Sequence, residues 1–119
     1  MLNIKKMFLK LLTPTTQTYT TSSLNHLVSC TITVERIGKY GNLYIAARNT
    51  STNLAVGSDA TCKIDNFPNL YGGSRGIGWS GSSGMIGAVT ANGTVTIRPI
   101  GSQWVSNYDT GITVPVIFK

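Results

Sequence analysis

The chain has 119 residues, which is enough for one domain with a modest core. Charged residues make up 12% and hydrophobic residues 41%, a composition that excludes a disordered acidic or basic chain. Half of the net charge of +6 comes from Lys5, Lys6 and Lys10, and the other basic residues are scattered, so we expect no nucleic-acid binding. No apolar run approaches the roughly 20 residues of a membrane span, so we expect no membrane insertion.

Residues 1–12 are the only helical candidate. Ile4, Met7, Phe8 and Leu11 recur at helical spacing, and Pro14 ends the pattern. A helix of about three turns is marginal alone, so this stripe needs a partner. A second copy of the chain would serve, and a membrane-surface helix is the alternative. The next residues, up to Ser23, are polar and β-branched, which indicates either an extended linker or a first edge strand.

Alternating apolar residues then predict several short strands. The clearest covers residues 27–37 and faces Val28, Cys30, Ile32 and Val34 to one side. A return strand at 42–48 turns Leu43, Ile45 and Ala47 inward. Shorter strands are expected at 60–64 and 75–80. Polar loops fill residues 49–59 and 65–73.

The last third of the chain carries the strongest β pattern. Asn92-Gly93 lies between the β-rich runs 85–90 and 94–99, which predicts a hairpin with a type I′ turn. Residues 112–118 form a final apolar strand, which Pro115 should confine to a sheet edge or a bulge. We therefore expect an all-β protein, an antiparallel β-sandwich with a short N-terminal helix. Its parts are a stem and linker at 1–23 and a head domain at 24–119.

The sequence offers little catalytic chemistry. Residues 76–81 match G-x-G-x-x-G, but no helix follows to receive a phosphate, so the match is a chance one. His26 is the single histidine, and the sequence contains no Gly-x-Ser-x-Gly nucleophile elbow whose serine it could activate. Cys30 and Cys62 read as two buried thiols, with a disulfide as the alternative. We expect no enzyme activity, no cofactor and no metal site.

Aromatic residues beside polar loops are the better functional signal. Residues 101–109 combine two aromatic rings with amide and carboxylate groups, which suits a saccharide whose C–H faces stack and whose hydroxyls need partners. The candidate saccharide-binding residues are Trp104, Tyr108, Asp109, Gln103, Asn107, Trp79 and Tyr71. The alternative for each tryptophan is packing in the core or against a neighbouring subunit.

The order of elements from about Ala60 onward resembles the C-terminal head domains of tailed-phage receptor-binding, tail-fibre and baseplate proteins. The matching pieces are residues 64–68, 91–97, 101–104 and 112–118. The resemblance implies a compact jelly-roll-like β-sandwich, commonly a homotrimer, that attaches to host cell-surface saccharide. It also implies other tail or baseplate proteins as partners, a place in the virion, and assembly in the host cytoplasm.

Two further interpretations stay open. A structural tail or baseplate component would use the same fold without binding a glycan. A secreted lectin or adhesin would need a signal peptide, and Lys10 interrupts the apolar region where one is expected. Exposure of Trp79, Trp104 and Tyr108 around a concave site would favour the receptor-binding head over the structural component.

Overall fold

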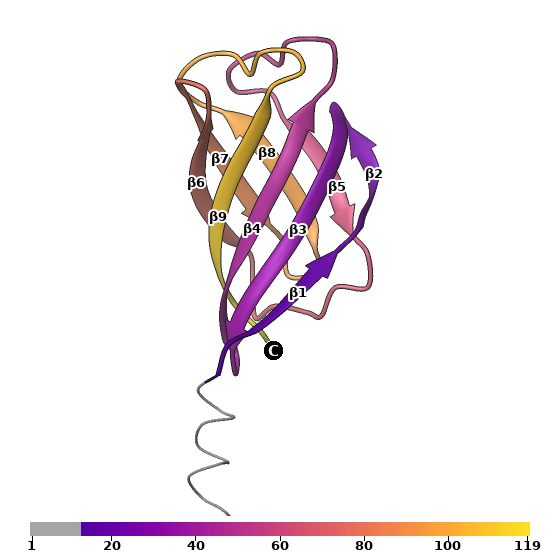
Figure 1. Ribbon diagram of the computed structural model, residues 1–119, viewed down its shortest axis with the longest axis vertical. Helices are drawn as coiled ribbons and strands as arrows, with labels where there is room; N and C mark the ends of the chain where they lie inside the picture. The colour runs from indigo at the N-terminus through magenta and orange to yellow at the C-terminus, as the bar shows by residue number, and fades with distance from the viewer. Residues whose placement is uncertain (1–12) are drawn as a thin grey trace, which may run out of the picture.

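The computed structural model describes residues 13–119 and shows an all-β protein (Figure 1). The described chain forms nine strands, every pairing between them being antiparallel. The strands are β1 (Thr15–Tyr19), β2 (Thr21–Asn25), β3 (Leu27–Ile37), β4 (Tyr40–Asn49), β5 (Ala60–Ile64), β6 (Ser74–Ser80), β7 (Ser83–Val89), β8 (Thr94–Pro99) and β9 (Asp109–Ile117). Within residues 13–119, no helix is long and apolar enough to cross a membrane.

The nine strands form one sheet in the order β1-β3-β4-β9-β6-β7-β8-β5-β2. Its two edges, β1 and β2, are separated in sequence only by Thr20. Tyr19 pairs with Ile32 of β3, and Thr21 pairs with Ile64 of β5. The chain therefore steps from one edge of the sheet to the other at Thr20, and the sheet is nearly closed on itself. Figure 1 shows the strands wrapping around a shared interior.

The interior is filled by the inward residues of these alternating strands. In β9, and in β4 from Leu43 onward, every second residue is buried, as the period of two in a strand requires. Trp104 and Phe118 are the largest fully buried side chains, and they lie just outside the named strands, toward opposite ends of β9. Asn49 is buried among the apolar residues and is fully hydrogen-bonded.

Strand β6 is inverted relative to this pattern. Its apolar residues Ile77 and Trp79 point outward, while Gly78 and Ser80 point inward. A Cβ on Gly78 would lie 2.0 Å from the carbonyl oxygen of Gly111 in β9, and one on Gly76 would lie 1.8 Å from that of Thr113. Glycine is thus required where β6 approaches β9, which explains the G-x-G spacing without any nucleotide.

The prediction of an all-β antiparallel domain is confirmed. The strands are hydrogen-bonded into one continuous sheet, so the two separate layers of a sandwich are not confirmed. The expected N-terminal helix lies outside the described residues. The edge-strand alternative for the polar segment is correct, because β1 and β2 pair with β3 and β5, and the sheet therefore begins at Thr15 within the predicted linker.

The hairpin between β7 and β8 is present, but the predicted type I′ turn is wrong. Only Gly93 has a positive φ, of 91°, and Asn92 does not. The amide of Gly93 donates to the carbonyl of Thr90, and the amide of Thr90 to that of Thr94. This is the three-residue pattern in which an ordinary turn is followed by one left-handed residue, and glycine supplies that residue.

Two local expectations also fail. Val28 is exposed, because the register between β3 and β4 shifts between Leu27 and Ser29 and turns Leu27 inward in its place. Strand β9 is an interior strand, so the prediction of an edge at Pro115 is wrong. Pro115 is tolerated because the ladder with β6 ends at Thr113, and beyond it the Ser74 hydroxyl donates to the Pro115 carbonyl.

Candidate functional site

Trp79 is a large apolar side chain left open to solvent in the middle of the sheet. It is 67% exposed, and its direct neighbours on the two flanking strands are Gly111 of β9 and Gly84 of β7. Cross-strand side chains normally cover an aromatic ring from both sides. Because both neighbours here are glycine, the indole lacks that cover.

The residues around Trp79 form a shallow face across β3, β4, β9 and β6. Cα pairing aligns Thr31, Ala46, Gly111 and Trp79 in one row, and Ser29, Arg48 and Asp109 in the next. We call these seven residues the Trp79 face. A hollow of about 340 Å³ lies on it, lined by Ser29, Thr31, Ala46, Ala47, Asp109 and Thr110. Small side chains form its floor. Trp79 does not line this hollow and lies in the same row of the sheet, one strand beyond Gly111.

A weak ion pair supplies the charged groups of this face. Arg48 Nη1 lies 3.7 Å from Asp109 Oδ1, and both side chains are largely exposed. An exposed pair of this length contributes well under 1 kcal/mol to stability. Both groups therefore remain able to bind hydroxyls of a ligand, the guanidinium as a donor and the carboxylate as an acceptor.

Tyr108 lies beside the Trp79 face. It directly precedes β9, and a Cβ on Gly81 in the β6–β7 turn would lie 3.7 Å from its Cε2 atom. The backbone is fixed here by Ser80, whose hydroxyl donates to the carbonyl of Asp109 at 2.7 Å. The structure therefore brings together three of the sequence-predicted residues, Trp79, Tyr108 and Asp109.

Trp104 is not part of this surface, so its prediction as a saccharide-binding residue is wrong and the alternative, packing in the core, is correct. Its side chain is 0% exposed, and Nε1 donates to the carbonyl of Tyr108 at 3.1 Å. Its own amide and carbonyl pair with Leu54 at 2.8 and 2.9 Å. The loop at 100–108 folds over the end of the sheet, and the indole closes the core there. Trp104 is a packing residue and cannot stack on a saccharide.

The other predicted residues are scattered. Gln103 and Asn107 are exposed in the same loop as Trp104, on either side of the buried indole. Tyr71 lies at the opposite end of the sheet, where its amide donates to Ile117 at the end of β9. Since Asp109 and Ile117 are eight residues apart in one strand, Tyr71 is roughly 26 Å from the Trp79 face.

Sequence reasoning missed Asn49, Arg48 and Gly111. The Asn49 amide donates to the carbonyls of Thr52, Trp104 and Val105, so it fastens the loops at 50–59 and 100–108 together. His26 Nδ1 shares a hydrogen bond with Asn49 Oδ1 at 2.8 Å, which gives this histidine a structural role. In the sequence, Arg48 was marked only by its outward position in a predicted strand. Its partner Asp109 could not be predicted, because their pairing depends on the register between β4 and β9.

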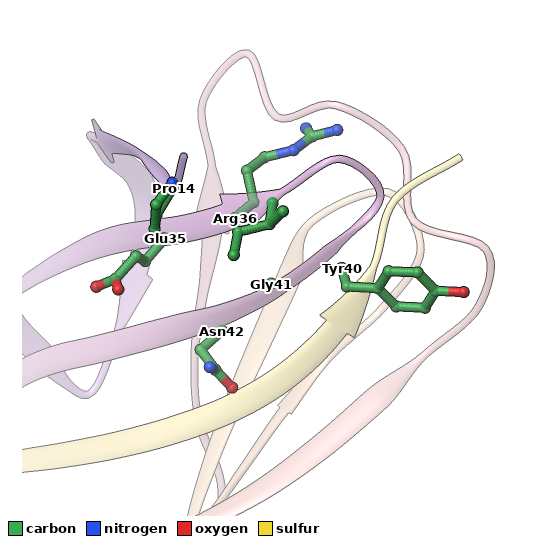
Figure 2. Close-up of a pocket in the computed structure, with 7 residues that line it drawn as sticks. Pro14, Glu35, Arg36, Tyr40, Gly41 and Asn42 are labelled. Carbon is green, nitrogen blue, oxygen red and sulfur yellow. The ribbon is translucent and has the colours of Figure 1, made fainter. Parts of the chain in front are cut away.

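Two other hollows are less convincing as sites. One of about 280 Å³ lies at the β3–β4 hairpin, but Figure 2 shows the Glu35 carboxylate and the Tyr40 ring pointing away from each other. Its polar groups do not converge. Another, of about 320 Å³, is lined by Arg75, Arg98 and Asp59. There Arg98 donates to both carboxylate oxygens of Asp59 and lowers the Asp59 pKa, so these two charges are paired within the protein.

Among residues 13–119, no group of three or more His, Cys, Asp or Glu side chains is arranged to hold a metal ion. Comparisons with protein-family models, with curated proteins and with solved structures find no match to this chain. The functional proposal therefore depends on the geometry of the Trp79 face together with the sequence resemblance.

Proposed function

We propose that this chain is a receptor-binding head of a phage tail fibre or baseplate, and that it attaches to host cell-surface saccharide through the Trp79 face. One observation carries the proposal: a tryptophan two-thirds exposed on a strand whose neighbours on both sides are glycines. An indole exposed to water forgoes the favourable free energy of burial that Trp104, the other tryptophan, gains in the core. A ligand that covers the indole offsets that cost.

The chemistry around the indole suits a sugar ring. The apolar C–H face of a pyranose stacks on the ring, while Arg48, Asp109 and the hydroxyls of Ser29 and Thr31 bind its hydroxyl groups. Each hydrogen bond contributes only about 1 kcal/mol, so a single site binds weakly. Several copies held together reach useful strength by avidity.

A homotrimer is the second part of the proposal. Ile37, Tyr40, Tyr71 and Ile117 are large exposed residues gathered at the end of the sheet opposite the Trp79 face, and we call them the Tyr40 patch. Tyr40 pairs directly with Ile37 and Ile117, and Tyr71 is bonded to Ile117. The first described residues also lie at this end (Figure 1). The predicted apolar stripe at 4–11 and the Tyr40 patch together form the subunit contact.

Light scattering tests this assembly. We expect a trimer, with a mass three times the 12.7 kDa of the chain, and we expect Tyr40→Glu to reduce it because a charge enters an apolar contact. A matched Thr33→Glu change, on the same face but away from the patch, leaves the trimer intact. A monomer at micromolar concentration for the unmodified protein contradicts the proposal.

The finer description of the fold belongs to the same proposal: a jelly-roll-like sandwich whose two layers are the two halves of the curved sheet. A structural tail or baseplate component is the second candidate function. The observation that favours it is the Tyr40 patch, which fits a neighbouring virion protein as well as it fits a second copy.

Tryptophan fluorescence separates these functions. Trp104 is buried and Trp79 is exposed, so a saccharide selected from a glycan array should shift only the Trp79 emission. We expect a saturable blue shift in the unmodified protein and none in Trp79→Phe. If no glycan on a broad array binds a confirmed trimer, the structural component is the correct function.

A further inference from the structure

Cys30 of β3 and Cys62 of β5 are the only cysteines of the chain, and neither belongs to the Trp79 face. Both are buried and both are free thiols. They point into the interior from strands that come close together without pairing directly. Two neighbouring thiols can be oxidised to a disulfide, which small hydrophobic side chains cannot form.

The two cysteines lie where the sheet closes. Strand β1 pairs with β3 up to Tyr19, and β2 pairs with β5 from Thr21 onward, so the chain crosses from β3 to β5 here and no backbone ladder joins these two strands directly. Immediately past the crossing, the Thr21 hydroxyl donates to the Cys30 carbonyl at 2.7 Å. The side chains of Cys30 and Cys62 both enter the core behind it, and the two thiols are near enough for each to shift the pKa of the other.

We propose that Cys30 and Cys62 form a reversible disulfide that locks the closure of the sheet, with a low-molecular-weight disulfide such as oxidised glutathione as the oxidant. The bond would join β3 to β5 covalently at the place where no backbone ladder does. Its loop would run from residue 30 to residue 62, through β4 and the loop at 50–59.

The exchange proceeds in two balanced steps. The thiolate of one cysteine attacks one sulfur of the oxidant, and one thiolate of the oxidant leaves. The other cysteine then loses its proton to water and attacks the sulfur of the first, which releases the second thiolate. Two protein thiols are oxidised to one disulfide, and one small-molecule disulfide is reduced to two thiols.

The two thiols influence each other's ionisation. The neighbouring Cys30 thiol lowers the pKa of Cys62, and the neighbouring Cys62 thiol, together with burial, raises the pKa of Cys30. One thiolate is therefore stabilised while the second thiol keeps its proton until the mixed disulfide exists, and either cysteine can attack first.

Strand β2 provides the access. Its residues are nearly all exposed, and its register with β5 shifts between Ser22 and Asn25. Edge segments with few buried contacts open locally more often than the rest of a fold. Opening of β2 uncovers Cys62 without unfolding the core, so the oxidant can reach it in the native protein.

The test treats the whole chain with oxidised glutathione and measures intact mass, free thiols after denaturation, and the melting temperature. We expect the monomer mass to fall by two hydrogens and both thiols to be lost. Tm should rise by on the order of 10 °C, because closing a long loop restricts the unfolded chain. Dithiothreitol should reverse all three changes.

The Cys30→Ala and Cys62→Ala variants are the matched controls, since each keeps one buried thiol. Neither should gain thermal stability from the oxidant, and the comparison of oxidised with reduced unmodified protein stands even if a variant fails to fold. Unchanged mass, a disulfide between two chains, or a lower Tm after oxidation overturns the proposal. None of these outcomes depends on saccharide binding.

Discussion

Replacing Gly78 with alanine is expected to destabilise the fold by about 3 kcal/mol or more, and to prevent folding if the domain is marginally stable. The added Cβ would lie 2.0 Å from the Gly111 carbonyl oxygen and 2.8 Å from the Ile112 Cα. Both are backbone atoms of the neighbouring strand, so no side-chain rotation relieves the clash. Chemical denaturation or a thermal melt measures the loss.

Gly111→Ala is the matched control for this prediction. Gly111 lies in β9 opposite Trp79, its φ is not in the left-handed region, and a Cβ there meets nothing within 4 Å. We expect its melting temperature to stay within a few degrees of the unmodified protein. If Gly78→Ala is as stable as Gly111→Ala, the close approach of β6 to β9 is wrong.

Trp104→Ala is expected to cost about 3–5 kcal/mol of unfolding free energy, the range for a fully buried large aromatic residue. The indole is 0% exposed, and the change also removes one of the two donors to the Tyr108 carbonyl, which keeps only the Asn49 amide. Because Asn49 holds both loops through the carbonyls of Thr52, Trp104 and Val105, the end of the sheet should loosen as a unit.

Hydrogen exchange with a thermal melt checks the Trp104 prediction. Amides at 50–59 and 100–108 should lose protection first, since these loops share the cavity that the indole leaves. Trp79→Ala is the control, and it should change stability by less than about 1 kcal/mol because that indole is two-thirds exposed. A stable Trp104→Ala variant would mean that Trp104 is not a core residue.

Most of the strand pattern was predictable because alternation is written directly in the sequence. Strands β3 and β5 have the predicted bounds, and the inward phase of Leu43, Ile45 and Ala47 in β4 follows from simple counting. Sheet closure was not predictable in this way. It depends on Thr20, where a polar edge strand leaves β3 and joins β5, and no local pattern encodes that choice of partner.

The candidate site was half predictable, and the two tryptophans show why. Residues near polar loops were expected to be exposed, yet Trp104 is buried. The side-chain amide of Asn49, 55 residues away in sequence, donates to the Trp104 carbonyl, and the indole N–H donates to the backbone carbonyl of Tyr108. Trp79 is exposed because Gly76 and Gly78 must face inward, which forces the apolar residues of β6 outward. A strand whose apolar phase conflicts with its packing is where a functional surface is expected.

Binding of the unmodified protein, Trp79→Ala and Ile77→Ala to the same glycan array tests the central claim most directly. Trp79 and Ile77 are matched, being 67% and 69% exposed apolar residues two positions apart in β6, and Ile77 belongs neither to the Trp79 face nor to the Tyr40 patch. All three proteins should be trimers with similar melting temperatures. The account predicts that Trp79→Ala loses binding at least tenfold, which corresponds to about 1.4 kcal/mol, while Ile77→Ala retains it. Retained binding by Trp79→Ala, or loss only in Ile77→Ala, contradicts the Trp79 face as the saccharide site.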